Sequence, residues 1–271
     1  MYSDLGRPPL HVPSLRRAVV RPGSYWQSLE VVESTGSTNA DLAAAARAGA
    51  LDGAVLVAES QESGRGRQDR SWVSPPRAGL TFSVLLRPDG VPPARWGWLP
   101  LLAGVALTRA VGRLAEVDAW LKWPNDLLLG PHRRKAAGLL AEVADGGVVV
   151  GIGLNVTTTA EELPRPDATS LGLEDGACLD RAPLLAAVLR ELGQDYVTWR
   201  DVGGDPEVSG LRRVYAESCD TVGRQVKVML PGDAVLTGEA VDVDADGRLL
   251  VRPALGGDVV AVAAGDVVHV R

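Results

Sequence analysis

The stretch from Gln61 to Trp72 carries the residue types best suited to bind an anion. It follows an apolar run over 54–58 that predicts a buried strand, so the chain passes from a rigid element into a loop. Gly64 and Gly66 allow the backbone N–H groups to turn towards a ligand. Planar, forked donors suited to phosphate or carboxylate come from Arg65, Arg67 and Arg70. A solvated arginine loop without a function is the alternative, because short motifs often arise by chance.

A second polar cluster, Ser37-Thr38-Asn39, precedes an alanine-rich run that ends at Gly49. Alanine favours helix, so the three residues are expected at a helix N-terminus. At least one of them should be the N-cap, because serine, threonine and asparagine fill that position most often. A second hydroxyl then stays free for a polar ligand, so the two roles are compatible.

Lys122 stands between Trp120 and Trp123 in an otherwise apolar stretch. The residues 120–129 predict two strands folded about the turn Pro124-Asn125-Asp126. A simple hairpin turn with incidental charges is one interpretation. Against it, a lysine on an apolar strand must find an anion or open onto a pocket, because burying an unpaired ammonium is costly.

The elements that hold these residues follow from apolar periodicity and turn residues. Gly151 and Gly153 interrupt one apolar strand, where a ligand or another backbone should approach closely. The expected strands beyond those named above cover 29–32, 80–86, 136–143 and 148–156. The expected helices cover the alanine-rich run to residue 48, then 96–116, 183–199 and 206–218, and residues 157–180 are expected as a surface loop.

Three regions are expected along the chain. Residues 1–28 form an N-terminal arm, because their four prolines leave no room for the consecutive helices of a DNA-binding module. Residues 29–218 form the main domain, which carries all the motifs above. Residues 219–271 contain five short strands with Pro-Gly and Asp-Gly turns, the pattern of a small β-barrel.

Composition narrows the class of protein. Of the 271 residues, 46% are hydrophobic and 23% charged, as in soluble globular proteins, and the net charge is −6. An acidic chain has no general attraction to nucleic acid or anionic membranes. Cys178 and Cys219 lie too far apart, and too far from any histidine cluster, to predict a zinc site or a disulfide scaffold. Without a signal-type core or an uncharged apolar run of membrane-spanning length, a cytoplasmic location is expected.

Together the motifs resemble those of the biotin protein ligases over nearly the whole chain. Any one of them alone would be weak evidence, but six in order, followed by a small barrel, form a specific signal. The matching segments are Ser37-Thr38-Asn39, Gln61 with Gly64 to Arg67, Lys122 to Asp126, Arg134 to Gly138, Gly151 to Asn155, and Ala168 to Leu171. The resemblance implies an α+β fold, with a mixed central sheet flanked by helices as in class II aminoacyl-tRNA synthetases, and an SH3-like β-barrel at the C-terminus.

The resemblance implies an enzyme that joins biotin to a protein in two steps. ATP and biotin, with Mg²⁺, give biotinyl-AMP, and a lysine of the biotin carboxyl carrier domain of an acyl-CoA or pyruvate carboxylase then receives the biotinyl group. A monofunctional enzyme without a DNA-binding domain is implied. The oligomeric state stays open between a monomer and a weak homodimer. The role of the barrel, in closure over ATP or in acceptor docking, stays open.

The resemblance also divides the candidate residues by role. Asp126 orients a lysine, ligates magnesium or activates the incoming amine. The implied catalytic residues are Arg65, Arg67, Lys122, Asp126 and Lys135. The implied biotin-binding residues are Ser37, Thr38, Asn39, Gln61, Gly64, Arg65, Arg67, Lys135, Gly138 and Gly151. The implied ATP and adenylate residues are Arg67, Arg70, Trp72, Lys122 and Asn155.

Two departures from the family pattern and two rival functions accompany this interpretation. Gln68-Asp69 places an acid where a flexible glycine is usual, which could slow loop closure, and Ala136 replaces a larger apolar residue. Without ligand, the loops 64–70 and 157–166 are expected to be disordered. The rivals are a lipoate ligase or octanoyltransferase of the same superfamily, and a non-catalytic biotin-responsive regulator.

Overall fold

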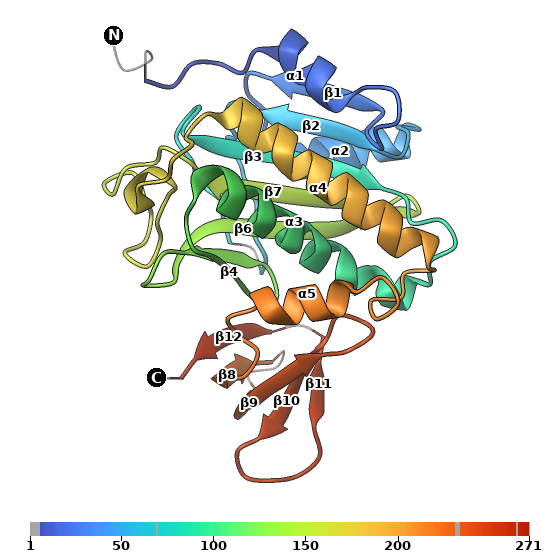
Figure 1. Cartoon of the computed structure of the whole chain (residues 1–271), viewed down its shortest axis with the longest axis vertical. Coiled ribbons are helices and arrows are strands. Elements are labelled where there is room, and N and C mark those ends of the chain that lie inside the picture. The colour runs from blue at the N-terminus through green and yellow to red at the C-terminus, as the bar shows by residue number, and fades with distance from the viewer. Residues whose placement is uncertain (1–5, 69, 231–233, 264, 271) are drawn as a thin grey trace.

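A mixed seven-stranded sheet forms the centre of the molecule (Figure 1). The structure is a computed structural model that describes residues 6–68, 70–230, 234–263 and 265–270. The strand order is β1-β2-β3-β7-β6-β5-β4, with β1 parallel to β2 and every other neighbouring pair antiparallel. The strands are β1 (Ser28–Val32), β2 (Ala54–Ala58), β3 (Gly79–Leu86), β4 (Ala119–Lys122), β5 (Asp126–Leu129), β6 (Arg134–Ala144) and β7 (Gly147–Asn155). The predicted α+β class with a mixed sheet is confirmed.

The two faces of this sheet have different surroundings. The helices α3 (Trp98–Ala115) and α4 (Arg181–Asp201) cover one face, and α2 (Thr38–Arg47) packs on the other. Side chains alternate along a strand, so β3 sends Leu80, Phe82, Val84 and Leu86 into the main core. Ser83, between them, meets α2 instead. The face beside α2 therefore carries polar and small residues, and it is the face on which a ligand can lie.

Helix α3 has the length and apolar composition of a membrane span, counted with the 3₁₀ turn η1 (Pro93–Gly97) before it. Most of it is buried inside the molecule. On its outer side Arg109 pairs with Asp195 of α4 at 2.9 Å. These features are those of the core helix of a globular domain.

The C-terminal region folds as a five-stranded antiparallel sheet in the order β11-β10-β9-β8-β12. Only three residues separate β11 from β12, so the two edges of the sheet lie close together, as in a small barrel. This arrangement fits the predicted SH3-like β-barrel. The strands are β8 (Gln225–Met229), β9 (Val235–Val243), β10 (Leu249–Pro253), β11 (Val260–Val262) and β12 (Asp266–His269).

Two tryptophans of the main domain donate hydrogen bonds to the turn between β9 and β10. The indole N–H of Trp98 donates to the carbonyl of Ala245 at 3.0 Å, and that of Trp123 donates to Gly247 at 3.2 Å. The backbone N–H of Asp220 also donates to the carbonyl of Leu121 in β4 at 2.7 Å. These contacts hold the C-terminal sheet against the main domain, and the division near residue 219 stays a prediction.

The predicted helix over 206–218 is wrong in its first turn, because α5 covers Leu211–Ser218. The carboxylate of Asp205 accepts the N–H groups of Glu207 and Val208 at 3.0 and 3.1 Å, which forms a separate turn. Gly210 then takes a left-handed conformation, with φ of 74°, directly before α5. A local side-chain bond and a glycine therefore overrode the helix signal of Pro206.

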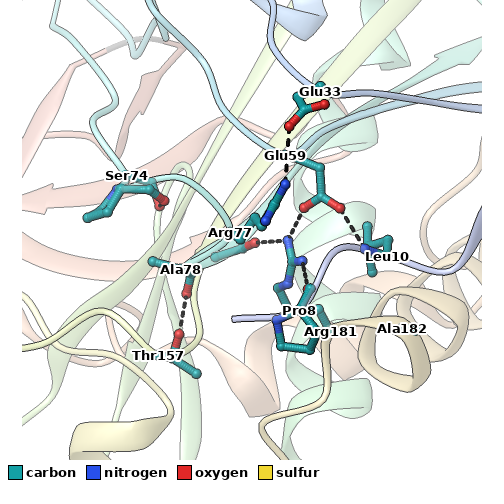
Figure 2. Close-up of polar contacts among 12 residues, drawn as sticks. Pro8, Leu10, Glu33, Glu59, Ser74, Arg77, Ala78, Thr157, Arg181 and Ala182 are labelled. Atoms are coloured by element: carbon teal, nitrogen blue, oxygen red, sulfur yellow. Dashed lines mark hydrogen bonds and ion pairs between the residues drawn. The ribbon is translucent and has the colours of Figure 1, made fainter. Parts of the chain in front are cut away.

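The N-terminal arm contains α1 (Val12–Val19), the single helix among the described residues ahead of β1. Leu15 and Val19 of α1 are buried in the main core. The backbone of residues 8–10, before α1, crosses the start of α4, as Figure 2 shows. The arm is thus packed on the main domain along its length from residue 7 to β1.

Candidate functional site

A cavity of about 1120 Å³ opens on the face of the sheet beside α2. Its walls come from the loop after β2, the turn between β4 and β5, parts of β6 and β7, the segment 164–168 and the strand β12. The predicted site residues that line it are Ser37, Thr38, Asn39, Gln61, Arg65, Arg67, Arg70, Trp72, Lys122, Asp126, Lys135, Gly138, Gly151 and Asn155. Of the predicted site residues, Gly64 alone lies outside the lining.

The glycines of the basic loop serve the geometry of the loop itself. The N–H of Trp72 donates to Gly64 at 2.8 Å, and the N–H of Gly66 donates to Arg70 at 2.6 Å. A Cβ on Gly64 would lie 2.3 Å from the carbonyl oxygen of Trp72, so this position requires glycine. The N–H of Gly66 is thus used within the loop, and the turning of other loop N–H groups towards a ligand stays a prediction. Asp69, the departure noted above, lies outside the described residues.

Arg67 is the loop arginine that points deepest into the cavity wall. It donates to the amide oxygen of Asn125 at 3.3 Å, and no carboxylate of the described residues lies within ion-pair distance of it. Burial lowers the pKa of Arg67, and the carboxylates of Asp266 and Asp126 partly oppose that shift. An anionic ligand at this place would offset the cost of the buried guanidinium.

The two other loop arginines contact acids on different walls. Arg65 pairs with Glu142 of β6 at 3.4 Å, and half of its side chain is exposed. Arg70 pairs with Asp266 at the start of β12. The basic loop is therefore tied to both the central sheet and the C-terminal sheet, which bracket the cavity.

The two lysines of the cavity differ in their surroundings. The ammonium of Lys135 lies 2.6 Å from the Oδ1 atom of Asp126, and both side chains are partly exposed. Lys122 is half-buried and lines the cavity, and its ammonium has no hydrogen bond or ion pair with any described residue. The prediction that Lys122 opens onto a pocket is confirmed. Its unpaired charge is available to a ligand.

The helix start at α2 divides its polar groups between a cap and the cavity. Ser37 is the N-cap, and its hydroxyl oxygen accepts the N–H of Ala40 at 3.5 Å. The N–H and the hydroxyl of Thr38 both donate to the Oε1 atom of Gln61, at 2.8 and 3.0 Å. The amide NH₂ of Gln61 is thereby turned away from α2.

The side-chain amide of Asn39 hydrogen-bonds to neighbouring groups of the protein. Its NH₂ donates to the carbonyl of Leu140 at 3.1 Å and to Glu142 at 2.8 Å, and its oxygen accepts the hydroxyl of Ser83 at 2.6 Å. A Cβ on Gly151 would lie 2.2 Å from that oxygen. Asn39 and Gly151 therefore lie against each other, and both line the cavity, so their contacts with biotin stay a prediction.

Trp72 covers the neighbouring part of the sheet. A Cβ on Gly153 would lie 2.3 Å from its indole ring, and one on Gly138 would lie 3.4 Å from it. Its indole N–H is buried and has no partner among the described residues. The side chains of Trp72 and Asn39 lie close to the glycines of β7, and both glycines also line the cavity. The approach of a ligand to them stays a prediction.

Asn155 ends β7 and joins it to the following segment. Its NH₂ donates to the carbonyl of Thr169 at 3.0 Å. Thr169, Ser170 and Leu171 are fully buried, and the backbone of Thr169 pairs with that of Lys135. The prediction of a surface loop over 157–180 is wrong for residues 168–171, because they add a strand-like edge beside β6.

The C-terminal sheet contributes His269 to the cavity. The Nε2 atom of His269 lies 3.1 Å from the hydroxyl of Thr221, and Nδ1 lies 3.5 Å from the carboxylate of Asp220. Burial lowers the pKa of His269 to about 4, the charge of Lys122 adds to the shift, and Asp220 opposes it. The imidazole is therefore neutral at neutral pH.

This shift gives a pH dependence of stability. Between the folded pKa of about 4 and the ordinary value of 6.5, the unfolded chain binds a proton at His269 that the folded chain does not. The free energy of unfolding should therefore fall as pH drops from 7 to 5. Urea unfolding at both pH values should show a smaller fall in His269→Gln, with exposed His132→Gln as the control. An equal fall in wild type and His269→Gln would contradict the assignment.

Several residues that line the cavity or contact its lining escaped prediction. Ser83 is a polar residue inside the apolar run of β3, and Glu142 is a charge inside that of β6, so both carried a usable signal. His269, Asp220 and Asp266 carried none, because their approach to the cavity depends on how the C-terminal sheet docks. Among the described residues, no group of three or more His, Cys, Asp or Glu side chains could hold a metal ion by itself.

Comparisons with known proteins agree with these features. Residues 31–158 match the model of the biotin/lipoate A/B protein ligase family, and residues 221–270 match that of the biotin protein ligase C-terminal domain. The biotin–[acetyl-CoA-carboxylase] ligase of Mycobacterium tuberculosis is 46% identical over 99% of this chain and 98% of its own length. The bifunctional ligase/repressor BirA of Escherichia coli is 31% identical over 85% of this chain and 72% of its own length.

Solved structures show the same relation. The biotin protein ligase from Aquifex aeolicus in complex with biotin and ATP superposes with a TM-score of 0.73 and 27% identity, over 91% of this chain and all of that one. The first family model spans biotin and lipoate enzymes alike, but the C-terminal match and the full-length relative both concern biotin. This chain belongs to the biotin protein ligase family.

Proposed function

We propose that this protein is an ATP-dependent biotin protein ligase that works in two steps. In the first, the biotin carboxylate attacks the α-phosphorus of ATP, which forms biotinyl-AMP and releases pyrophosphate. In the second, a lysine amine of an acceptor protein attacks the carbonyl of this anhydride, and AMP leaves. The observation that carries the proposal is the gathering of Arg65, Arg67, Lys122 and Lys135 around one cavity.

The first step brings two anions together, so cations must lower their repulsion. They also stabilise the charge that collects on the phosphoryl oxygens in the transition state. We assign the biotin carboxylate and the α-phosphate to Arg65, Arg67 and Lys135, and the outer phosphates to Lys122. The unpaired state of Lys122 and the buried guanidinium of Arg67 support this assignment.

The polar ring of biotin belongs, in this proposal, at the start of α2. Because Gln61 Oε1 accepts both donors of Thr38, its NH₂ group is free to donate to the ureido oxygen. The hydroxyl of Ser37 accepts from Ala40 and keeps its own proton to donate. We assign the adenylate to Trp72, Arg70 and Asn155, where the side-chain oxygen of Asn155 is open to a ligand donor.

Magnesium fits the carboxylate of Asp126. The ion is usually held by one or two carboxylates together with substrate phosphates. Lys135 contacts the Oδ1 atom of Asp126, so the Oδ2 atom is the one that would ligate the ion. When bound, the ion would neutralise phosphate charge. Of the three roles left open for Asp126, the 2.6 Å contact favours orienting Lys135 over ligating magnesium or activating the amine.

The acceptor in this proposal is the biotin carboxyl carrier domain of a carboxylase. The name of the relative from Mycobacterium tuberculosis points to acetyl-CoA carboxylase as the acceptor of that enzyme. We further propose action in the cytoplasm, as a monomer or weak homodimer, without a nucleic-acid or membrane partner. The net charge of −6 supports the absence of nucleic acid.

The test is to incubate the protein with ATP, magnesium, biotin and a purified carrier domain, and to follow the mass of the carrier. We expect one biotinyl adduct, and biotin-dependent exchange of pyrophosphate into ATP. Lipoate or octanoate in place of biotin should give no adduct, which separates the rival ligases. Biotin binding without an adduct and without exchange would contradict the proposal and favour a non-catalytic regulator.

A further inference from the structure

The N-terminal arm is fastened to the main domain next to one wall of the cavity. Glu59, directly after β2, forms an ion pair of 2.6 Å with Arg181, the first residue of α4, and about 7% of each side chain is exposed. Arg181 also donates to the carbonyl of Pro8 at 2.7 Å, and the N–H of Leu10 donates to Glu59 at 2.6 Å. Figure 2 shows this crossing of the arm over the ion pair.

This buried ion pair fixes the backbone of residues 8–10. Both oxygens of Glu59 are used, one by Arg181 and the other by Leu10, so no part of the buried carboxylate lacks a donor. Burial of ions is tolerated when their hydrogen bonds are satisfied in this way. Glu59 lies two positions before Gln61 of the cavity lining. The arm is therefore anchored to the main domain beside the cavity.

From this anchor, Arg7 reaches across to the segment after β7. Its guanidinium donates to both oxygens of Glu162, at 2.9 and 2.6 Å, and to the carbonyl of Thr157 at 2.9 Å. The hydrogen bond from Arg7 is the main cause that lowers the pKa of Glu162 to about 2, and one from the N–H of Thr159 adds to it. Two-point pairing of this kind has a fixed geometry and is stronger than a single contact.

The same segment reaches the catalytic lysine at its other end. The N–H of Lys135 donates to the carbonyl of Asp167 at 2.9 Å, and the N–H of Thr169 donates to the carbonyl of Lys135 at 2.8 Å. Between the two anchors, Pro164 and Arg165 line the cavity. The loop over 157–167, named here the arm-held loop, is thus fixed by Arg7 at one end and by β6 at the other.

We propose that Arg7 is a positioning residue of the enzyme: through Glu162 and Thr157 it holds the arm-held loop against the cavity and so retains biotinyl-AMP until the acceptor arrives. This inference rests on the proposed function. Arg7 touches no substrate, since it is not part of the cavity lining. A mixed anhydride is lost to water when its site opens, so the fraction of time that the loop is open sets the rate of loss.

The first test measures release of biotinyl-AMP from the preloaded enzyme in the absence of acceptor. Arg7→Ala should release it about 5- to 10-fold faster than wild type, the range for a two-point ion pair that is partly exposed. The rate of biotinyl-AMP formation at saturating substrates should change less than twofold. The control is Arg109→Ala, which loses the two-point pair with Asp195 between α3 and α4, outside the cavity lining and the arm-held loop, and should release at the wild-type rate.

A double-mutant cycle identifies the partner. Glu162→Gln should also speed release, and Arg7→Ala with Glu162→Gln should add little to either single change. Unchanged release in Arg7→Ala, or fully additive effects, would overturn the inference.

Hydrogen exchange of the free protein tests the loop apart from catalysis. Amides of residues 157–162 should exchange faster in Arg7→Ala than in wild type or Arg109→Ala, whether or not the protein forms biotinyl-AMP. No difference in exchange would overturn the role of Arg7. Failure of wild type to form biotinyl-AMP, with the exchange difference present, would instead reject the proposed function. The disorder expected without ligand in the loops 64–70 and 157–166 stays a prediction.

Discussion

Lys135→Ala is expected to slow the formation of biotinyl-AMP by about two to three orders of magnitude, the usual effect of removing one preorganised donor from a developing charge. Lys135 lines the cavity, and its ammonium is held 2.6 Å from Asp126, so its position is set before substrate binds. The side chain is one-third exposed and leaves no cavity in the core when shortened. The fold should therefore persist.

The measurement is single-turnover formation of biotinyl-AMP, with thermal unfolding of the same samples. Asp126→Asn is the informative companion, because it keeps Lys135 and removes the negative charge beside it. If Asp126 only orients, its loss should cost less than that of Lys135. A wild-type rate in Lys135→Ala would contradict the assignment, and an unfolded variant would mean that the lysine is structural.

Lys122→Met is expected to lower the rate of adenylation by about 100-fold while leaving the melting temperature unchanged or slightly raised. The half-buried ammonium has no partner among the described residues, so its removal breaks no hydrogen bond and relieves desolvation. The loss should appear in the dependence on ATP concentration and be small for binding of biotin alone. This pattern would separate Lys122 from Lys135, which serves both substrates.

The chain offers a matched control for this change, because Lys227 is the only lysine besides Lys122 and Lys135. Lys227 is exposed on β8 and outside the cavity, so Lys227→Met should leave both adenylation and ATP dependence as in wild type. Equal effects of the two substitutions would mean that net charge, rather than position, matters. A large fall in the melting temperature of Lys122→Met would contradict the absence of a structural partner.

Local signals in the sequence predicted the elements and much of the cavity. The apolar runs marked β2, β3 and β7, and the alanine-rich run marked α2 with Ser37 as its cap. The direction in which a polar group points was harder to predict. Thr38 and Asn39 are neighbours in the same helix start and both contact Ser83. Asn39 nevertheless reaches Glu142, whereas Thr38 reaches Gln61. Helix periodicity separates such neighbours only when the packing of the helix on the sheet is known.

Contacts between distant parts of the chain could not be predicted in the same way. Arg7 meets Glu162 across 155 positions, and Arg70 meets Asp266 across 196. No rule of sequence spacing predicts either pair, because each pair depends on which loops the fold brings together. The wrong start of the helix at Pro206 has a local cause, since Asp205 and Gly210 each favoured a turn that the apolar pattern did not reveal.

The contact between Lys135 and Asp126 bears on whether biotinyl-AMP can react with the enzyme itself. Biotinyl-AMP acylates amines, and a lysine beside it would be the first amine within reach. An ammonium has no lone pair with which to attack, and the carboxylate of Asp126, 2.6 Å from Nζ, is a partner for the ammonium form of Lys135. In the proposed mechanism this contact would spare Lys135 from acylation, and the reactive carbonyl would be left for an amine that arrives from another protein.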